Sequence, residues 1–412
     1  MKWNKKLFTA SVLCLTVSGG QAFASGYATG LTSTSGLATS YAGSATGMHD
    51  ASDMFFNPAI LANTKDSEFI FSVSYKSFDV NPQGATTASG SATGSEVRDA
   101  GVDTTLPALY VAKRINENAV FGLAVTSPFG IQNKYDPNWQ GKERSVETSV
   151  TTLNINPSLA YKLTDKLSLG AGLEAQYITA TFTGMTSIGG GNHAANKMHG
   201  SDWGYGYTLG AKYQATDRLK FGLGYRSKID HNLAGNIRII GRSSSNVEAQ
   251  LSTPESVTGG AAYKFNPTIE LAYDVTWTRW SRINQMSMVA YQNSTINSAL
   301  QKPRALVYKD SVMHAVGANF ALNDKWLLRS GVAYEKETTI GTRMPSANNI
   351  WASLGFNYKL SKTFSIDASY MHQFYQNSAI RFKDSSATSD NSLNLHYKIR
   401  SDVFSLALKK EF

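Results

Sequence analysis

Residues 167–177 alternate at every position between an apolar side chain and a small or polar one. Leucine, alanine and tyrosine fill the odd positions, whereas serine, glutamate, glutamine and glycine fill the even ones. A period of two residues places these two sets on opposite faces of a β-strand. The same alternation recurs over residues 268–277 and 364–370. Such runs approach the ~10 residues that a strand needs to cross a membrane, with one face suited to lipid and the other to a wet interior.

The first 24 residues predict a secretory signal peptide of the bacterial type. Three lysines precede an apolar run over residues 7–17, and AFA at residues 22–24 has the form of a cleavage site. The run is too short to anchor the chain, because the ~30 Å hydrocarbon core requires about 20 residues. Cleavage removes the only cysteine, Cys14, so the mature chain has neither a disulfide nor a thiol nucleophile. It also removes three of the 39 basic residues. The mature chain then has 36 basic and 30 acidic residues, so the net charge falls from +9 to +6.

The rest of the chain has no stretch of about 18 apolar residues that would form a transmembrane helix. Charged residues are 17% of the chain, below the ~25% usual in soluble domains, whereas tyrosine and phenylalanine are plentiful. An exported chain of this kind is expected to form a closed barrel, the other backbone that satisfies its own hydrogen bonds in lipid. A soluble sandwich also alternates, but it seldom places aromatic residues at the ends of so many strands.

Short polar turns and long polar stretches alternate along the chain. The turns are Asn116-Glu117-Asn118, Thr164-Asp165-Lys166, Thr216-Asp217-Arg218, Asn266-Pro267, Asn323-Asp324-Lys325 and Ser361-Lys362. Long loops are expected over residues 128–147, 188–202, 230–255, 284–308 and 376–392. Six turns divide the barrel into seven intervals of two strands, which predicts fourteen antiparallel strands with both termini in the periplasm. The last alternating run ends on Phe412, an ending typical of outer-membrane barrels.

We therefore divide the mature chain into an N-terminal plug, or hatch, over residues 25–63 and a barrel over residues 64–412. Fourteen strands enclose more space than their inward side chains fill, since ~8 strands already suffice for a filled interior. The plug segment has no spanning strand, yet it contains Phe55 and Phe56, which need burial. The alternative, a disordered periplasmic tail, accounts poorly for paired aromatic residues beside Asn-Pro.

SGLATSYAGSATGMHDASDMFFNPAIL (residues 35–61) resembles the hatch of the FadL/TodX (OMPP1) family of outer-membrane transporters for hydrophobic compounds. The family pattern is S-G-L-G-x-A-Y-x-G, followed by D-A and N-P-A. Further similar segments follow in order: LPALYVAKRINENAVFGLAVTSPFG, LNINPSLAYKL, DWGYGYTLGAKY, FGLGYRS and WASLGFNYKL. The resemblance implies an all-β fold, a 14-stranded antiparallel transmembrane β-barrel plugged by a hatch, in the outer membrane of a Gram-negative bacterium. It also implies gated passive uptake of long-chain fatty acids or other apolar molecules. In the family, movement of the hatch opens a passage for the ligand, and in some members the ligand leaves sideways through the barrel wall.

Asn57, Pro58 and Ala59 match the hatch motif of the family, and their position favours a role in gating. Proline fixes its own φ, and asparagine bonds to neighbouring backbone, so an ordinary tight turn explains the same residues equally well. Phe55 and Phe56 either contact the ligand or wedge the plug against the wall.

The segment PFGIQNKYDPNWQGKER (residues 128–144) holds candidate ligand contacts. Phe129, Tyr135 and Trp139 supply an apolar surface on which a hydrophobic molecule can land. Arg144 supplies a charge for a carboxylate or for a lipopolysaccharide phosphate. The alternative is a solvated loop that contacts only lipopolysaccharide.

Tyr308-Lys309-Asp310 resembles a Phe-Lys-Asp of fatty-acid transporters in the family, in which the lysine meets the ligand carboxylate. Lys309 is therefore the candidate polar contact, and a salt bridge with a carboxylate such as Asp310 is the alternative. Residues 176–181 lack the arginine that those members carry. A neutral hydrocarbon or aromatic ligand therefore stays open.

Two other classes of function are alternatives, an outer-membrane hydrolase of the phospholipase kind and a general porin. The seven histidines are scattered and no G-x-S-x-G motif occurs, so no enzyme is expected. A porin would have an acidic constriction loop. His193 and His199 lack a third ligand at a metal spacing, and no metal or cofactor is expected. Scattered charges disfavour binding to nucleic acid. The chain is expected to be a monomer. Its expected partners are hydrophobic small molecules, outer-membrane lipid and lipopolysaccharide.

Overall fold

The computed structural model describes residues 27–412 except residues 88–89, 92–96, 143–144, 190–191, 240, 242, 284, 287, 292–303, 306–307, 339–346, 377 and 383–392. The predicted signal peptide, residues 1–24, therefore lies outside the described residues. Within the described part of the chain, no helix is long and apolar enough to cross a membrane.

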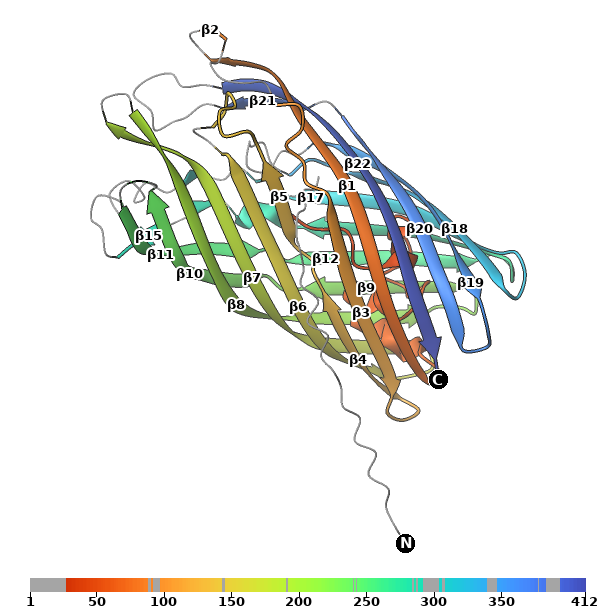
Figure 1. Ribbon diagram of the computed structural model, residues 1–412. Helices are drawn as coiled ribbons and strands as arrows, with labels where there is room; N and C mark the ends of the chain where they lie inside the picture. Colours follow the sequence, from red (N-terminus) through yellow and green to blue (C-terminus); the bar gives the residue numbers. More distant parts are fainter. Residues whose placement is uncertain are drawn as a thin grey trace.

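Fourteen antiparallel strands of the described residues form one closed circuit (Figure 1). In order around the wall they are β1 (Ser67–Thr87), β3 (Thr104–Arg114), β4 (Ala119–Thr126), β6 (Glu147–Lys162), β7 (Leu167–Gly189), β8 (Asn192–Gln214), β9 (Leu219–Arg226), β12 (Ser256–Lys264), β13 (Ile269–Thr278), β17 (Ser311–Ala321), β18 (Trp326–Glu335), β19 (Asn349–Lys359), β20 (Phe364–Tyr375) and β22 (Leu393–Glu411). The last strand pairs with the first from Glu68↔Glu411 to Thr87↔Leu393. Closure leaves no unpaired edge, as the hydrocarbon requires. The predicted 14-stranded antiparallel barrel is confirmed.

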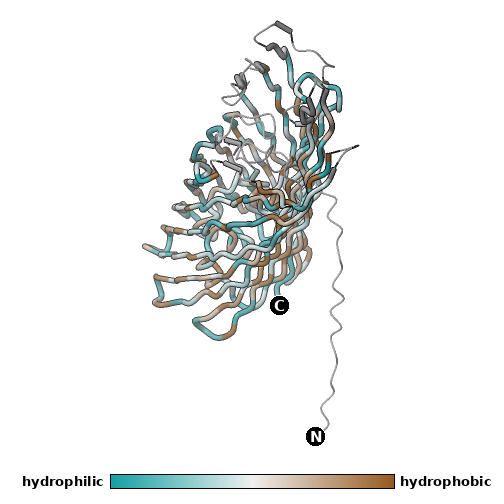
Figure 2. Tube along the Cα trace, turned by 90° about the vertical axis from the view of Figure 1, so that its left-hand side faces the viewer, coloured by the Kyte–Doolittle hydropathy of each residue, from teal (hydrophilic) through white to brown (hydrophobic). Residues whose placement is uncertain are grey.

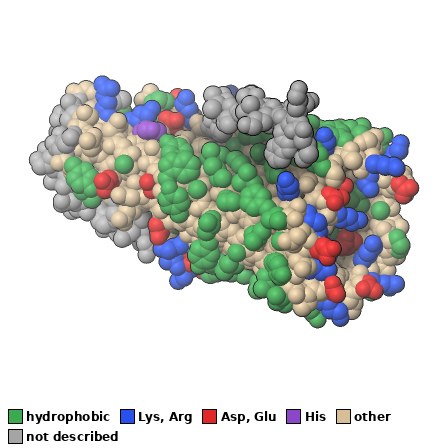
Figure 3. Space-filling view, turned by 90° about the horizontal axis from the view of Figure 1, so that it is seen from below, with side chains coloured by type: hydrophobic (Ala, Val, Ile, Leu, Met, Phe, Trp, Pro, Cys, Tyr) green, Lys and Arg blue, Asp and Glu red, His purple; other side chains and the backbone are tan. Residues whose placement is uncertain are grey.

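The wall alternates as the sequence predicts. On β7, Leu173 is 70% exposed on the outside, whereas the neighbouring Glu174 is 2% exposed in the lumen. Alternation of hydropathy runs along strand after strand in Figure 2, and Figure 3 shows hydrophobic side chains gathered over the middle of one face, with charged side chains on either side of them. Lipid can therefore contact an apolar exterior while the polar set faces inward.

All six predicted short turns connect neighbouring strands, at the same end of the barrel as the C-terminus (Figure 1). Their sequences favour this geometry because an Asn or Thr side chain bonds to the backbone of the turn. Asn116 Oδ1, for example, accepts hydrogen bonds from Asn118 N and Ala119 N, both at 2.9 Å. Asn323 does the same for Lys325 N and Trp326 N.

The prediction of loops over residues 188–202 and 230–255 is wrong for most of both stretches. β7 and β8 continue as one long hairpin up to the pairing Gly189↔Asn192. Strands β10 (Ile229–Ile239) and β11 (Ser243–Thr253) form a second hairpin. A strand that extends beyond the hydrocarbon needs no apolar face, so polar residues form its continuation. Such a strand shows no apolar–polar alternation, and the sequence pattern therefore does not reveal it. The remaining short strands are β2 (Gly90–Ser91), β5 (Gly130–Lys134), β14 (Gln285–Met286), β15 (Met288–Ala290), β16 (Arg304–Ala305) and β21 (Ser378–Phe382).

Residues 27–63, here called the plug, contain three short helices: α1 (Thr34–Leu37), η1 (Ala51–Phe55) and η2 (Pro58–Asn63). Side-chain caps start each helix. Ser33 accepts from Gly36 N, Asp50 from Ser52 N and Asn57 from Ala59 N. Such caps satisfy amides that a short helix leaves unpaired. Nearly all of the plug is buried, and Figure 1 shows it inside the barrel.

Candidate transport site

The plug lies directly against glycines of the barrel wall. A Cβ atom on Gly224 of β9 would overlap the Phe56 carbonyl oxygen, and one on Gly222 would overlap the Ala45 carbonyl. Gly331 of β18 likewise faces the Thr39 backbone. Only glycine permits an approach this close between two backbones. The sequence signal was glycine on the lumenal face of several strands, but the sequence alone does not reveal what lies against it.

Hydrogen bonds join the plug to strands around the whole circuit. The wall contacts are Tyr110 Oη to Thr32 O (2.5 Å), Asn57 Nδ2 to Ala211 O (2.9 Å), Ala45 N to Asp274 Oδ2 (2.8 Å), Asn319 Nδ2 to Met48 O (3.3 Å), Ser40 Oγ with Ser353 Oγ (2.8 Å) and Thr34 Oγ1 with Ser405 Oγ (2.6 Å). They come from β3, β8, β13, β17, β19 and β22. The seated plug therefore spans the lumen rather than lining one side of it.

The predicted gating residues form one turn anchored to β7 and β8. Asn57 is fully buried, and its Oδ1 accepts from Ala59 N at 3.0 Å. Its Nδ2 donates to Ala45 O at 2.7 Å and to Ala211 O at 2.9 Å. Pro58 occupies the first turn of η2, where a missing N–H costs nothing. One side chain thus holds together the start of a helix, the middle of the plug and the wall.

Phe55 and Phe56 are both half-buried, with ring centroids 5.1 Å apart. The Phe56 ring packs against Tyr41 of the plug at 5.2 Å. The guanidinium of Arg226 lies 3.9 Å from the Phe55 ring centroid, and Arg226 Nη2 donates to Phe55 O at 2.9 Å. Arg226 Nη1 also pairs with Glu174 of β7. This buried ion pair, which sequence reasoning missed, clamps the end of η1 to the wall.

Thr39, His49 and Asp53 inside the plug have the residue types of a hydrolase triad. His49 Nε2 lies 2.9 Å from Thr39 Oγ1, and His49 Nδ1 lies 2.9 Å from Asp53 Oδ1. Burial raises the pKa of the Asp53 carboxyl, and His49 acts in the opposite direction. The side chains of His49 and Asp53 are fully buried, and Thr39 also donates to Ala42 O at 2.9 Å. The three side chains are therefore bonded to one another and to the plug backbone, and they are buried away from solvent.

A large apolar cluster fills the end of the lumen opposite the short turns; we call it the outer cluster. Phe129, Tyr135 and Trp139 belong to it and are 7%, 2% and 1% exposed. The segment folds inward, so the apolar surface that these three residues form lies in the lumen, and their role as ligand contacts stays a prediction. Tyr135 and Trp139 stack at 4.1 Å, and Trp139 Nε1 donates to Ser145 O.

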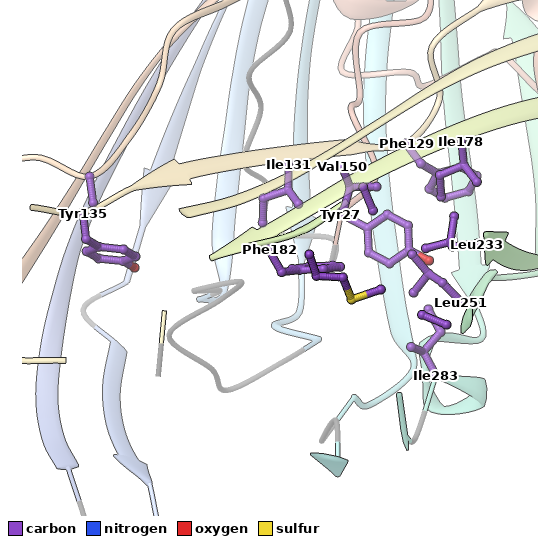
Figure 4. Close-up of a cluster of buried hydrophobic side chains, with 14 of the residues drawn as sticks. Tyr27, Phe129, Ile131, Tyr135, Val150, Ile178, Phe182, Leu233, Leu251 and Ile283 are labelled. Atoms are coloured by element: carbon purple, nitrogen blue, oxygen red, sulfur yellow. The ribbon is translucent and has the colours of Figure 1, made fainter. Parts of the chain in front are cut away.

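Tyr27, the first described residue of the plug, ends in the outer cluster. Its ring lies 5.6 Å from Phe129 and 5.1 Å from Trp280. Figure 4 shows it among Phe129, Leu233 and Leu251, with Tyr135 farther away. Its hydroxyl donates to Ser252 O. The plug therefore reaches from the periplasmic end of the lumen into its aromatic outer end.

Residues 127–129 interrupt the wall between β4 and β5, which both pair with β6. Here the plug takes over part of the ladder, since Thr29 N donates to Pro128 O and Gly130 N to Tyr27 O. We predicted only a loop from residue 128. The overlooked signal was Pro128 itself, because proline within a strand marks a bulge or an edge.

Lys309 and Arg144 stand apart from these contacts. The Lys309 side chain is exposed, whereas the preceding Tyr308 is buried and stacks with Trp280 at 5.9 Å. Asp310 Oδ1 accepts from Ser281 N at 2.9 Å. Arg144 lies outside the described residues. The structure thus brings together Phe129, Tyr135 and Trp139 in one cluster and Phe55 to Ala59 in the plug, with Lys309 in neither.

Residues 15–412 match the family model described as outer membrane protein transport protein (OMPP1/FadL/TodX). The chain is 24% identical to the long-chain fatty acid transport protein of Escherichia coli K12, covering 90% of this chain and 93% of that protein. It is 25% identical to outer membrane protein P1 of Haemophilus influenzae, covering 96% and 95%. A solved Pseudomonas aeruginosa FadL homologue superimposes with a TM-score of 0.85 at 25% identity, covering 94% and 100%. The Ralstonia pickettii toluene transporter TbuX, at 19% identity, a TM-score of 0.71 and coverage of 94% and 99%, shares the fold.

Proposed function

This chain belongs to the OMPP1/FadL/TodX family of outer membrane transport proteins, and we propose that it takes up hydrophobic molecules by passive diffusion through a plugged barrel. Membership confirms the predictions of an outer-membrane location and of a transporter rather than an enzyme. The candidate ligands are those named for its relatives, long-chain fatty acids for the Escherichia coli protein and toluene for TbuX.

The observation that carries this proposal is the chemistry of the lumen. The outer cluster is aromatic and aliphatic, and below it the plug fills the circuit. A general porin needs a polar, open path, and the apolar outer cluster offers small ions no replacement for their hydration. An apolar ligand gains free energy on entering such a cluster, because the hydrophobic effect favours its transfer from water.

We assign roles along this path from the outside inward. Exposed Lys309 provides the first positive charge for an anionic ligand, and Arg144, which lies outside the described residues, is the second candidate. Phe129, Tyr135 and Trp139 then line its apolar binding site once Tyr27 is displaced. Phe56, which packs on Tyr41, wedges the plug, and Phe55 is the ring that the ligand meets. The turn Asn57-Pro58-Ala59 acts as the hinge.

We further propose that the protein works as a monomer. Its own strands close the circuit and leave no edge for a second copy. Outer-membrane lipid and lipopolysaccharide are then the neighbours of its apolar outer wall.

Uptake by the full mature chain in liposomes tests the proposal. We expect faster entry of radiolabelled oleate, toluene or both than in empty liposomes, together with a nearly silent ion-conductance trace in planar bilayers. Steady conductance of small ions without uptake would favour a porin. Release of fatty acid from phospholipid would favour a hydrolase.

Asn57→Ala combined with Pro58→Ala is expected to change the uptake rate without affecting barrel assembly. The cap alone contributes about 0.5–2 kcal/mol, the buried carbonyl of Ala45 loses a donor at about 1–3 kcal/mol, and the half-buried carbonyl of Ala211 loses one as well. Assembly is checked by the shift in gel mobility on heating. Asn323→Ala is the matched control, since this side chain also accepts from backbone amides, those of Lys325 and Trp326, but lies in an exposed turn. Unchanged uptake in the double variant would count against the hinge.

A further inference from the structure

A groove crosses the outer surface of the barrel wall on β13, β17, β18, β19, β20 and β22. It has a volume of about 700 Å³, and all of its lining residues belong to these strands. The small side chains of Ala318, Ser330 and Ala352 form its floor, and strand register places Ala318 directly opposite Ser330. Val332 and Leu354, which are 54% and 60% exposed, rise beside them. The groove therefore lies on the lipid side of the wall, not in the lumen.

The groove descends from the outer part of the wall toward its periplasmic end. Arg400, at the upper end, lies 11 residues before the periplasmic end of β22 at Glu411. Leu271, at the lower end, lies only 2 residues after the periplasmic start of β13 at Ile269. Neighbouring strands about 4.8 Å apart give the groove a length of roughly 24 Å. Each leaflet contributes only about 15 Å of hydrocarbon, so the groove is long enough for one acyl chain.

Three side chains surround Asp402 at the upper end of the groove. Asp402 Oδ1 accepts from Tyr370 Oη at 2.7 Å and lies 2.7 Å from His372 Nδ1. Asp402 Oδ2 accepts from Arg400 Nε at 3.2 Å. The Arg400 side chain is nonetheless 68% exposed, and neither of its Nη atoms has a hydrogen-bond partner among the described residues. Asp402 thus holds the guanidinium in place while its outer edge stays available to a ligand.

The level of Arg400 marks the outer edge of the apolar wall on β22. Below it, Phe404, Leu406 and Leu408 are exposed on the outer face of the strand. Above it follows Lys398, which is exposed as well. Such a change from apolar to cationic side chains is expected where the hydrocarbon ends and the phosphate-bearing headgroups begin.

We propose that the groove binds a phosphorylated glycolipid of the outer leaflet, the lipid A part of lipopolysaccharide. One acyl chain lies along the floor, and a phosphate lies against Arg400 and Lys398. A guanidinium and a phosphate match in geometry and form charge-assisted bonds that are often bidentate. An acyl chain in a groove contacts protein atoms on three sides rather than on one, which adds dispersion contacts. The lipid belongs to the outer leaflet, because the cations lie at the end of the groove away from the periplasm.

This lipid site is separate from the transport path. On the inner side of the same strands, Gly331 lies against Thr39 of the plug, and Ser353 is bonded to Ser40. The groove and the plug thus occupy opposite faces of one wall. The inference therefore goes beyond the proposed uptake, and changes in the groove are expected to leave uptake as it is.

Asp79 of β1 provides a test of the opposite sign. It stands opposite Arg400 in the register of β1 and β22, on the side of β22 that faces away from the groove. A carboxylate there repels a phosphate bound to Arg400. Asp79→Asn is therefore expected to strengthen lipid A binding by about twofold to fivefold.

Native mass spectrometry of the delipidated full mature chain, with lipid A or phosphatidylglycerol added, tests the proposal. The wild type is expected to bind one lipid A more tightly than phosphatidylglycerol. Arg400→Gln is expected to weaken lipid A binding by about fivefold, the contribution of one basic residue at an anionic lipid surface. Ala352→Phe fills the floor of the groove and is expected to weaken lipid A binding by about threefold or more.

Two variants are the matched controls. Arg218→Gln removes an exposed arginine from a periplasmic turn, and Ala171→Phe adds a ring to the exposed outer face of β7, away from the groove. Both should bind lipid A as the wild type does. Oleate uptake in liposomes should be the same in the wild type and in all of these variants.

Three outcomes would overturn the proposal. The first is equal lipid A binding by the wild type, Arg400→Gln and Ala352→Phe, each shown to be folded by its heat-dependent gel mobility. The second is equal affinity of the wild type for lipid A and phosphatidylglycerol, because the groove would then not select an outer-leaflet lipid. The third is a dimer that Ala352→Phe abolishes, because a second copy of the chain would then occupy the groove.

Discussion

Replacing Gly224 with leucine is expected to give a barrel that assembles normally and conducts ions. The Phe56 carbonyl oxygen lies where the new Cβ would be, so the leucine and the seated plug cannot occupy the lumen together without strain. Overpacking costs about 1–3 kcal/mol, and each 1.4 kcal/mol moves an equilibrium tenfold. We therefore expect the unseated fraction, measured as open events in planar bilayers, to rise by about tenfold or more.

Gly259→Leu is the matched control for this experiment. Gly259 lies on the neighbouring strand β12, and an added Cβ would have only Leu223 Cδ1 nearby, at 3.7 Å. This variant should stay as silent as the wild type. If Gly224→Leu is equally silent while it remains folded, the close fit between plug and wall does not control the seal.

Arg226→Met is expected to loosen the plug and to lower the stability of the barrel together. It removes the donor to Phe55 O and leaves Glu174 buried without its cation, a change that typically costs about 3–5 kcal/mol. The temperature at which the gel mobility shifts should fall, and ion conductance should rise. A second substitution, Glu174→Met, removes the stranded charge, so the double variant should regain much of the thermal stability.

Arg329→Met separates the two effects. Arg329 pairs with Asp367 inside the wall, where Asp367 also accepts from Asn357, and the charge of Arg329 acts on Asp50 of the plug only through space. Its loss should lower the stability in the same way but leave conductance low. Equal conductance in the Arg226 and Arg329 variants would show that the Arg226 clamp has no particular role in holding the plug.

The features predicted correctly depend on neighbours in the sequence. Fourteen strands and six turns followed from a two-residue period and from Asn and Thr side chains that bond within their own turns. The Asn57 cap is equally local, since its acceptor and the Ala59 amide are two residues apart.

The features that sequence reasoning missed depend on contacts between distant segments. Glu174 and Arg226 lie 52 residues apart, and each shows in the sequence only as one more inward polar residue. The burial of Trp139 depends on how its segment folds back over the lumen. The role of Gly224 becomes clear only when a different segment, the plug, is placed against it.

The length of β7 has a consequence for where a ligand enters. Its 23 residues, at about 3.3 Å each and tilted by about 40°, reach nearly 60 Å, about twice the ~30 Å of hydrocarbon. Because the turns at the other end are short, most of the excess stands above the membrane. For an oily solute the obstacle is the charged, hydrated layer over the hydrocarbon rather than the hydrocarbon itself. A wall this tall extends through that layer, so a solute inside the barrel passes it without contact with the charged headgroups.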